Sequence, residues 1–433
     1  MKVQSPITNR KSTTIWLMKE VSIVMDSVSG FSDFLPEWPY LQVTVGTLAV
    51  CVSYYVLNIA RKPRLIAKQG SFLRSFLVKH CPIMTEPYWP TIWCYGGRGQ
   101  TIIGSIMRSH PVVHYRQEFL NTPDGGEICL DWHDNGSQSS EDPDGYPTVL
   151  ILPGLTGNSQ QGYVLHFVKQ IQSLGYRSVV FNNRGLGGAK LKTPRTFCAA
   201  NTEDLEFVIS HLHKTKPGIP LVAVAVSLGG IILTNYLAKM GQSMPTGLIA
   251  AMTVSVAWDT FKSSRSLEEP LNWFIFNRHL TSLLCKLVMQ HLAMARKGGE
   301  NRPIDIDHVL KSKTIREFDD RYIAPMFGFS DSDDYYTAAS LHLKPLEEIS
   351  IPLLSLAAAD DPFAPISSLP LEKIKQCPNV VMALTSFGGH IGFTEGLLPV
   401  GAGYADRMMC QFVNSIFENR QAIQETNCSS DDL

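Results

Sequence analysis

Six short apolar runs recur between residues 148 and 386, and stretches with helical spacing separate them. Strands of a parallel sheet are apolar along their whole length because helices cover both faces of the sheet. Parallel neighbours also need a crossover, which is usually a helix, so strands and helices alternate along the chain. The pattern therefore predicts an α/β fold with a mostly parallel sheet. The predicted strands are Thr148–Pro153, Ser178–Asn182, Leu221–Val226, Leu248–Val256, Pro352–Ala359 and Val380–Ser386.

A β-hairpin is predicted ahead of these runs. In Thr122–Trp132 an Asp-Gly-Gly triplet stands between two stretches with strand character. Asp-Gly is a strong signal for a tight turn between antiparallel strands. We therefore expect antiparallel strands before the parallel part of the sheet.

A long insertion separates two of the predicted strands. Roughly ninety residues lie between the run ending near Ala257 and the run beginning at Pro352, far more than a crossover needs. Apolar and aromatic residues recur there at near-helical spacing, which predicts a helical cap over 258–345. An ordinary packing subdomain is the alternative. The other predicted segments are an N-terminal segment (1–37), a membrane anchor (38–60), a linker and N-terminal extension (61–115), a core in two parts (116–257 and 346–417) and a flexible tail (418–433).

The predicted anchor runs from Trp38 to Ala60 and contains no charged side chain. About 20 mostly apolar residues suffice to span a bilayer as a helix. Aromatic residues near both ends and a basic flank beginning at Arg61 are typical of a transmembrane helix. A single-pass membrane protein is therefore predicted, with a buried core helix as the alternative.

The orientation of this anchor depends on the charges that flank it. Acidic residues precede the span and basic residues follow it, so the positive-inside rule places the C-terminal body in the cytoplasm. The sequons at Asn135 and Asn427 would instead be usable if the body were lumenal. The compartment stays open, with the endoplasmic reticulum as one candidate.

Charge and motifs argue against several classes of ligand. The formal net charge is −1, which gives no overall attraction to nucleic acid, so no nucleic-acid partner is expected. The loop Asn182–Gly188 is rich in glycine but has neither P-loop nor dinucleotide spacing, and Arg184 within it is interpreted as a structural partner or a phosphate contact. Asp305, Asp307 and His308 fit a capped helix start better than a metal site. We expect no cofactor and no metal.

The segment Leu221–Ala238 reads as a buried strand, then Ser227, two glycines and an apolar helix. This arrangement is typical of a nucleophile elbow, in which small residues two before and two after the serine permit a tight turn. Gly229 fits the pattern, whereas Ala225 stands where glycine is usual. A serine that only caps a helix is the alternative.

A serine nucleophile needs a histidine base and a carboxylate that orients it. In an elbow-type enzyme these follow the serine in the order Ser, Asp, His. Asp361 begins Asp-Pro-Phe-Ala-Pro after one predicted strand, and His390 follows Gly-Gly after the next. We predict Ser227, Asp361 and His390 as the catalytic residues, with Asp360 as the competitor for the acid.

The developing negative charge needs two backbone N–H donors. Leu228, directly after the serine, supplies one candidate. The loop after the first strong strand, Leu152–Gly157, supplies Leu155 as the other. A plain glycine-rich strand exit is the alternative for this loop.

The wider sequence resembles the membrane branch of the α/β-hydrolase domain-containing family. The resemblance covers about 62–417 and implies the α/β-hydrolase fold, with Ser227, Asp361 and His390 in the family's catalytic positions. It departs from the family at Ala225, where relatives carry glycine. The stretches that carry it are YWPTIWCYGGRGQT, TPDGGEICLDW, LPGLTG, VVFNNRG, ANTEDLE, SLEEPLNWFIFN, TIREFDDRY, DDYYTAAS, ADDPFAP and GGHIGF.

The resemblance also implies an activity and a setting. Such proteins are single-pass membrane serine hydrolases, usually described with the body opposite to the side that the charges indicate. It implies phospholipase A1-type cleavage of phosphatidylcholines, particularly medium-chain or oxidatively truncated ones, so the expected partners are a phospholipid or other acyl-ester substrate and the bilayer. A carboxylesterase, an acyltransferase, or a non-catalytic membrane binding module suggested by Ala225 are the alternatives.

Overall fold

The structure is a computed structural model that describes residues 39–134, 146–241, 247–298 and 304–423. It divides into two compact units, Met1–Asn58 and Ile59–Leu433. The predicted segment 1–37, Trp38 at the start of the predicted anchor, the sequons at Asn135 and Asn427, and most of the predicted tail lie outside the described residues.

The described part of the first unit is helical. Helix α2 (Pro39–Tyr54) continues as a π-helical turn, Tyr55–Ile59. Within the part of the chain that the structure describes, Leu41–Ile59 is the one helix long and apolar enough to cross a membrane, with a mean hydropathy of 1.4. This finding concerns length and composition, and it agrees with the predicted anchor.

The second unit contains a nine-stranded sheet in the order β1-β9-β8-β7-β6-β4-β5-β3-β2. In this order, neighbouring strands from β9 across to β5 are parallel. Strand β1 pairs antiparallel with β9, β3 with β5, and β2 with β3. All six predicted strands and the predicted hairpin are confirmed. The strands are β1 (Arg64–Ile66), β2 (Arg116–Asn121), β3 (Glu127–His133), β4 (Thr148–Leu152), β5 (Arg177–Asn182), β6 (Leu221–Val226), β7 (Leu248–Val254), β8 (Leu353–Ala358) and β9 (Val380–Thr385).

Strand β6 shows how the sheet divides the core. Successive side chains of a strand point to opposite faces. Leu221, Ala223 and Ala225 therefore join one apolar cluster, together with residues of α6 (Glu203–Thr215) and α7 (Leu228–Met240). Their neighbours Val222, Val224 and Val226 join a second cluster on the other face. The helices of that second cluster are α3 (Phe72–His80), α5 (Gly162–Ser173) and α17 (Tyr404–Glu418).

The segment 61–115, expected as a linker and N-terminal extension, packs against the sheet. It supplies β1, which pairs with β9, and α3, in which Leu73 and Leu77 are buried. Ser71 caps α3 by accepting a hydrogen bond from the Arg74 N–H, a sequence signal for a helix start. The segment is held because its apolar face covers one side of the sheet, and its second helix is α4 (Gly97–Ile106).

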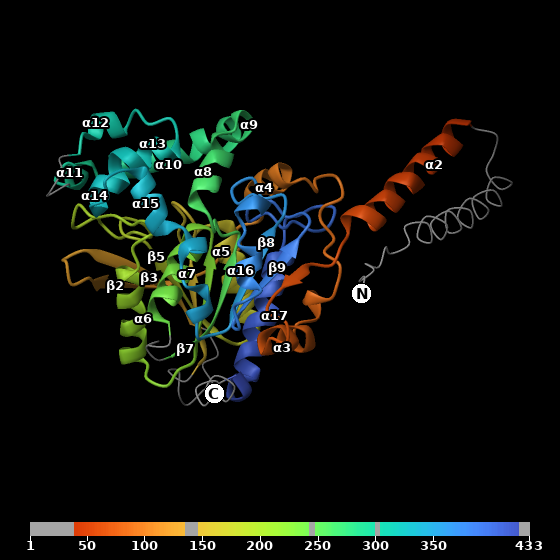
Figure 1. Cartoon of the computed structure of the whole chain (residues 1–433), viewed down its shortest axis with the longest axis horizontal. Helices are drawn as coiled ribbons and strands as arrows, with labels where there is room; N and C mark the ends of the chain where they lie inside the picture. The colour runs from red at the N-terminus through yellow and green to blue at the C-terminus, as the bar shows by residue number, and fades with distance from the viewer. Residues whose placement is uncertain (1–38, 135–145, 242–246, 299–303, 424–433) are drawn as a thin grey trace, which may run out of the picture. The chain divides into compact units, whose positions relative to one another are not determined.

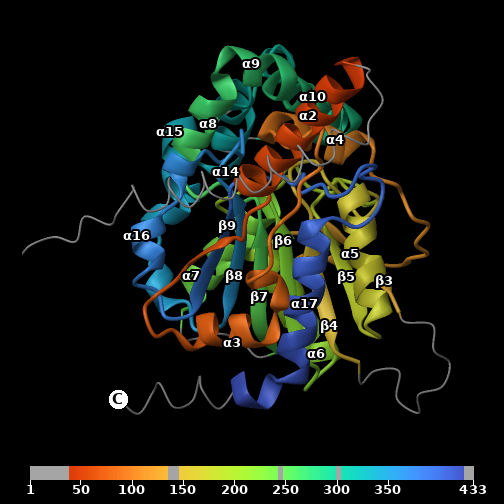
Figure 2. The same cartoon turned by 90° about the vertical axis from the view of Figure 1, so that its right-hand side faces the viewer.

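Short helices fill the chain between β7 and β8. Figure 1 and Figure 2 show them gathered at one end of the sheet, with α4 at the same end. Leu284, Val288 and Tyr322 pack into the core cluster that α7 also joins. The helices are α8 (Thr260–Glu268), α9 (Pro270–Asn272), α10 (Arg278–Gln290), α11 (Leu292–Ala295), α12 (Ile306–Val309), α13 (Ile315–Phe318), α14 (Ala324–Phe327) and α15 (Ser332–Ala339), with π-helical turns at Trp273–Asn277 and Asp319–Ile323.

The remaining helical elements are short. Helix α16 (Leu371–Ile374) lies between β8 and β9 along the chain. The 3-10 turns are Pro82–Met84, Leu341–Leu343, Leu346–Glu348 and Ile366–Ser368.

Candidate active site

Ser227 stands at the turn between β6 and α7. Its backbone has φ 51° and ψ −116°, a conformation that a side chain rarely adopts. Gly229 makes the turn possible, because a Cβ there would lie 2.5 Å from the carbonyl oxygens of Leu152 and Pro153. The strand, the strained serine and the close helix approach together form the predicted elbow.

Ala225 does not prevent this turn. Its side chain is fully buried in β6, where the residue pairs with Leu152 of β4 and Thr253 of β7. The methyl group joins the apolar cluster on the face of the sheet that α6 and α7 cover, while Ser227 keeps its positive φ. The departure from the family pattern is therefore accommodated in the structure.

Backbone strain gathers around the serine. Among the described residues, five that are not glycine have positive φ: Thr156, Ser227, Ser255, Ile391 and Phe393. All five follow the carboxyl ends of β4, β6, β7 or β9. The Ile391 N–H donates to Ser255 Oγ at 3.0 Å, so two of the strained loops hold each other. Strain of this kind concentrates at functional sites.

The structure brings the three predicted catalytic side chains together. Ser227 Oγ lies 2.9 Å from His390 Nε2. On the other side of the ring, Nδ1 lies 2.9 Å and 3.1 Å from the two carboxylate oxygens of Asp361. Asp361 and His390 are 3% and 8% exposed, so water has little access to the pair. A hydroxyl, an imidazole and a carboxylate thus touch in series.

The two neighbouring aspartates have different surroundings. Asp361 Oδ1 accepts hydrogen bonds from the Phe363 and Ala364 N–H groups, which aim the carboxylate at the imidazole. Asp360 turns elsewhere and accepts from the Gly389 N–H at 2.9 Å. Burial raises the pKa of Asp360 to about 7. The structure therefore places Asp361, and not Asp360, beside the imidazole.

His390 is also held by residues that the sequence analysis did not identify. The backbone N–H of His390 donates a hydrogen bond to Thr101 Oγ1 of α4 at 2.9 Å. The ring of Phe363 stacks on the imidazole, with centroids 4.1 Å apart and an interplanar angle of 12°. Gly389 permits the approach, because a Cβ there would lie 2.2 Å from the Gly97 oxygen. Thr101 lies 289 residues from His390 in the chain, so no local pattern could have pointed to it.

The oxyanion candidates, Leu155 and Leu228, line one cavity. Gly154, next to Leu155, approaches the serine closely, since a Cβ there would lie 3.2 Å from Ser227 Cβ. The cavity spans about 530 Å³, counting its opening to solvent. Most of its wall is apolar and comes from the helices between β7 and β8. Besides the two leucines, the lining includes Leu191, Phe197, Leu284, Leu287, Val288, Phe318, Tyr322, Ile323 and Tyr335.

One carboxyl group, Asp319, lies in this apolar wall. Tyr336 donates its hydroxyl hydrogen to Asp319 Oδ2 at 2.9 Å. Burial raises the pKa of Asp319 to about 7. A neutral carboxylic acid there adds little charge to a cavity suited to hydrocarbon.

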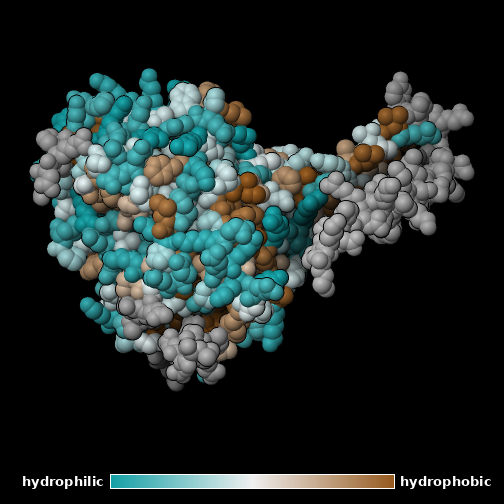
Figure 3. All heavy atoms as spheres, in the orientation of Figure 1, coloured by the Kyte–Doolittle hydropathy of each residue, from teal (hydrophilic) through white to brown (hydrophobic). Residues whose placement is uncertain are grey.

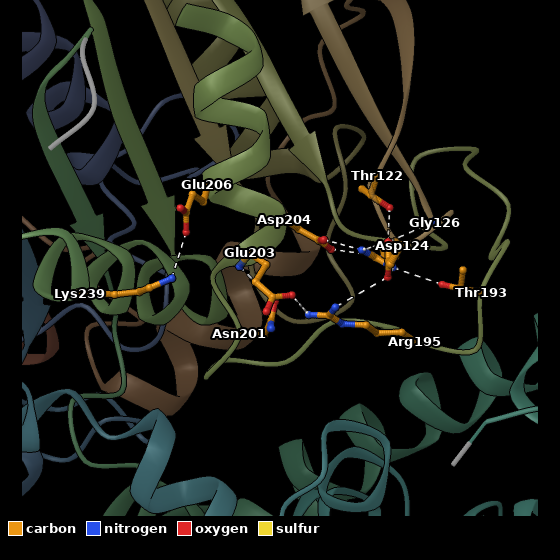
Figure 4. A network of polar contacts seen from close by, with 11 residues as sticks. Thr122, Asp124, Gly126, Thr193, Arg195, Asn201, Glu203, Asp204, Glu206 and Lys239 are labelled. Atoms are coloured by element: carbon orange, nitrogen blue, oxygen red, sulfur yellow. Dashed lines mark hydrogen bonds and ion pairs between the residues drawn. The ribbon is translucent and has the colours of Figure 1, made fainter. Parts of the chain in front are cut away.

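Arg184, in the glycine-rich loop, is a structural residue. It donates to Asp204 at 2.7 Å through both Nε and Nη2, and to Asp124 at 2.6 Å through Nη1. Figure 4 shows how these two aspartates converge from α6 and from the turn before β3. Because two carboxylates already hold the guanidinium, the structural interpretation of Arg184 applies rather than the phosphate contact.

Asp305, Asp307 and His308 lie at the start of a capped helix. Asp305 accepts a hydrogen bond from the His308 N–H at the start of α12. Across the ranges that the structure covers, no group of three or more His, Cys, Asp or Glu side chains could hold a metal ion.

Comparison with known proteins identifies the family. The family model described as "alpha/beta hydrolase fold" matches residues 147–397. Human "Phospholipase ABHD3" is 49% identical over 88% of this chain and 91% of its own length. Human "Monoacylglycerol lipase ABHD2" is 28% identical over 88% of this chain and 93% of its own. Mouse alpha/beta hydrolase domain-containing protein 10 is 17% identical over 70% of this chain and 99% of its own, with a TM-score of 0.42.

The chain belongs to the α/β-hydrolase fold family. The predicted fold class and the predicted ester hydrolase enzyme are confirmed by this membership together with the named relatives.

Proposed function

We propose that the protein hydrolyses an acyl ester bond of a phospholipid, with Ser227 as nucleophile, His390 as general base and acid, and Asp361 as the residue that orients the base. The observation that carries the proposal is the series of contacts from Asp361 through His390 to Ser227, at 2.9 Å on each side of the ring. The enzyme class is that of the family, and the substrate and the residue roles are inferred.

The geometry supports a two-step acyl transfer. Ser227 Oγ attacks the acyl carbonyl carbon while its proton passes to His390 Nε2. The same nitrogen then protonates the departing lysolipid oxygen, which leaves an acyl-serine. Water attacks this ester, again giving its proton to His390, and the fatty acid departs as Ser227 regains its hydrogen. Throughout, the Asp361 carboxylate accepts a hydrogen bond from the Nδ1–H group and stabilises the charged imidazole.

The oxyanion of each tetrahedral intermediate needs N–H donors beside Ser227. We assign this role to the backbone N–H groups of Leu155 and Leu228, which come from the β4 loop and from the first turn of α7. One such donor is worth about 2.7–4 kcal/mol of barrier. The apolar cavity that begins at these two leucines is suited to the acyl chain.

A phospholipid substrate is favoured by the relatives. The relative named a phospholipase is 49% identical, whereas the one named a monoacylglycerol lipase is 28% identical. We further propose phospholipase A1-type cleavage of phosphatidylcholines, medium-chain or oxidatively truncated, as the resemblance implies. We also propose that Leu41–Ile59 spans the membrane once and keeps the enzyme beside its substrate.

The experiment that tests the proposal uses the purified full chain and its Ser227→Ala variant. A fluorophosphonate probe should label the parent and not the variant. The parent should release fatty acid from phosphatidylcholine labelled at the sn-1 ester faster than from lipid labelled at sn-2. Equal labelling of parent and variant would contradict the catalytic role of Ser227. Labelling without phospholipid turnover would favour a carboxylesterase or acyltransferase.

A further inference from the structure

Large apolar side chains are exposed beside the loop that carries His390. They come from segment 89–93, from the end of α4 and from the loop before α17. Figure 3 shows one face of the molecule, on which groups of hydrophobic side chains stand among mostly hydrophilic ones. The members, together called the apolar patch, are Trp89 (45% exposed), Ile92 (44%), Trp93 (50%), Ile106 (72%), Leu397 (69%) and Leu398 (69%).

Hydrogen bonds hold the three segments together as one surface. Trp93 donates its indole N–H to the Leu397 oxygen at 2.7 Å. The Thr91 N–H donates to the Thr394 oxygen at 3.1 Å, and the Ser109 N–H to the Val400 oxygen at 2.9 Å. Segments far apart in sequence are thus fixed side by side, so their apolar side chains lie on one continuous face.

The apolar patch is coupled to the candidate active site through α4. The helix ends at Ile106 of the patch, and its Thr101 accepts the His390 N–H. Gly104 in between packs against the same loop, since a Cβ there would lie 3.0 Å from Gly392 Cα. Helix α4 therefore connects the apolar patch at one end with the loop that holds the base His390.

Charges of both signs flank the apolar patch, with an excess of positive ones. Glu86 and Glu395 border it, and Glu395 is paired with Arg407 at 2.8 Å. Arg61, Lys62 and Arg64 are exposed, and the Arg61 oxygen accepts the N–H of Tyr88, the residue before Trp89. Within the patch segments 87–95 and 396–402, no residue is charged. The helix with the length and composition of a membrane span ends at Ile59, two residues before Arg61.

We propose that the apolar patch docks on a lipid surface with anionic headgroups. Exposed apolar patches of this kind are uncommon on soluble proteins, and tryptophan favours the boundary between membrane and water. Basic side chains beside an apolar face add attraction to anionic lipid. The candidate span ends at Ile59, and the Arg61 oxygen that follows is bonded to Tyr88 beside the patch, so only a short stretch of chain joins the two. This docking goes beyond the proposed hydrolysis: it holds the His390 loop at the membrane, so that an ester reaches Ser227 from the lipid phase.

The experiment measures contact with lipid directly. An environment-sensitive fluorescent amino acid replaces Leu398 in the full chain, and Phe119 in a matched control. Phe119 is 45% exposed on β2, at the sheet edge opposite to β1. Each protein is reconstituted at one copy per vesicle into phosphatidylcholine and phosphatidylserine with brominated acyl chains. We expect quenching at position 398 about threefold greater than at position 119.

Equal quenching at the two positions would overturn the proposal. A signal at position 398 that requires two protein copies per vesicle would overturn it too, by assigning the patch to self-association. The measurement needs no catalysis and can be made in Ser227→Ala, so its failure is distinguishable from failure of the proposed hydrolysis.

A paired substitution provides a second readout. Leu397→Glu with Leu398→Glu should lower phospholipid hydrolysis in anionic vesicles by about tenfold and leave hydrolysis of soluble p-nitrophenyl butyrate unchanged. The soluble ester reports that the fold and the site are intact. Phe119→Glu should change neither rate. An unchanged rate on vesicles in the paired variant would also overturn the proposal.

Discussion

The loops at the carboxyl end of the sheet and the helical segment after β7 each bury a carboxyl group, but they surround it differently. Asp361 in the loops accepts two backbone N–H groups and the imidazole N–H. Asp319 in the helical segment accepts one tyrosine hydroxyl and lies in an apolar cavity wall, where burial raises its pKa to about 7. Donors around a carboxylate let it orient a base, whereas apolar surroundings favour a neutral acid that leaves the cavity suited to hydrocarbon.

The two regions also differ in the strain of their backbones. The loops contain all five of the strained non-glycine residues noted above, including Ser227. Between Thr260 and Ala339, positive φ occurs within the described residues only at Gly328. The sheet can hold strain because each of these loops begins at the end of a buried strand. The helices after β7 form a wall, and the loops hold the reacting groups.

The largest expected effect concerns the acid in the loops. Asp361→Asn should lower kcat for ester hydrolysis by about 10⁴, because an amide cannot hold the imidazole in the required tautomer. Asp360→Asn is the matched control and should cost much less, since its carboxyl bonds the Gly389 N–H. Steady-state rates on a soluble ester decide between them. A greater loss in Asp360→Asn would reverse the assignment.

The second prediction concerns the acid in the cavity wall. The folded-state pKa of Asp319, about 7, lies above the ordinary aspartate value of 3.8, so the folded protein binds this proton more tightly than the unfolded chain does. The resulting stability is fully present below pH about 4 and is lost as the pH rises through about 7. Between pH 5 and pH 8 the wild type should lose about 2 kcal/mol more unfolding free energy than Asp319→Asn.

Urea unfolding at the two pH values measures this difference. The control is Asp307→Asn, at an exposed aspartate of the same helical segment, which should follow the wild type. Identical pH dependence in the wild type and Asp319→Asn would contradict the raised pKa of Asp319 and its difference from Asp361.

A third prediction tests how α4 positions the base. Thr101→Val removes the acceptor of the His390 N–H and should lower kcat by about tenfold with little change in KM, because the base is displaced and not removed. Thr101→Ser keeps the hydroxyl and should recover most of the rate. If serine and valine behave alike, the hydrogen bond does not position the imidazole.

The smallest effect is expected at Ala225. Glycine there restores the usual elbow pattern, but Ser227 already has its strained backbone, so the rate should stay within about threefold of the parent. Thermal unfolding should show a loss of roughly 0.5–1 kcal/mol, because glycine weakens a strand. Ester hydrolysis that appears only in Ala225→Gly would instead identify the parent as a non-catalytic member.

Much of the fold could be predicted from the sequence because its signals are local. An apolar run such as Leu221–Val226 indicates a buried strand by itself, and Ser227 with Gly229 indicates a turn within five residues. The order Ser, Asp, His then led to side chains that the structure brings together, because successive parallel strands end at the same edge of a sheet. The Asp-Pro-Phe-Ala-Pro sequence favoured Asp361 over Asp360, and the structure adds the direction of the two side chains.

The parts that the sequence analysis missed depend on contacts between distant segments. Strand β1 has three residues, too few for a periodic signal, and exists because β9 offers it an edge. Thr101 resembles any helical threonine until His390 is placed against it. For α3 a signal was present, since Ser71 precedes an amphipathic stretch, but the sequence analysis assigned this stretch only to a linker and N-terminal extension.

The central claim is that Ser227 and His390 act as one unit, and a double-mutant cycle tests it most directly. The measurement is kcat/KM on a soluble ester for Ser227→Ala, His390→Ala and the double variant. We predict that all three are lowered to about the same extent, by 10⁴ or more, since losing either member disables the pair. A double variant slower by the product of the two single losses would contradict the account, because it would show that the two side chains act independently.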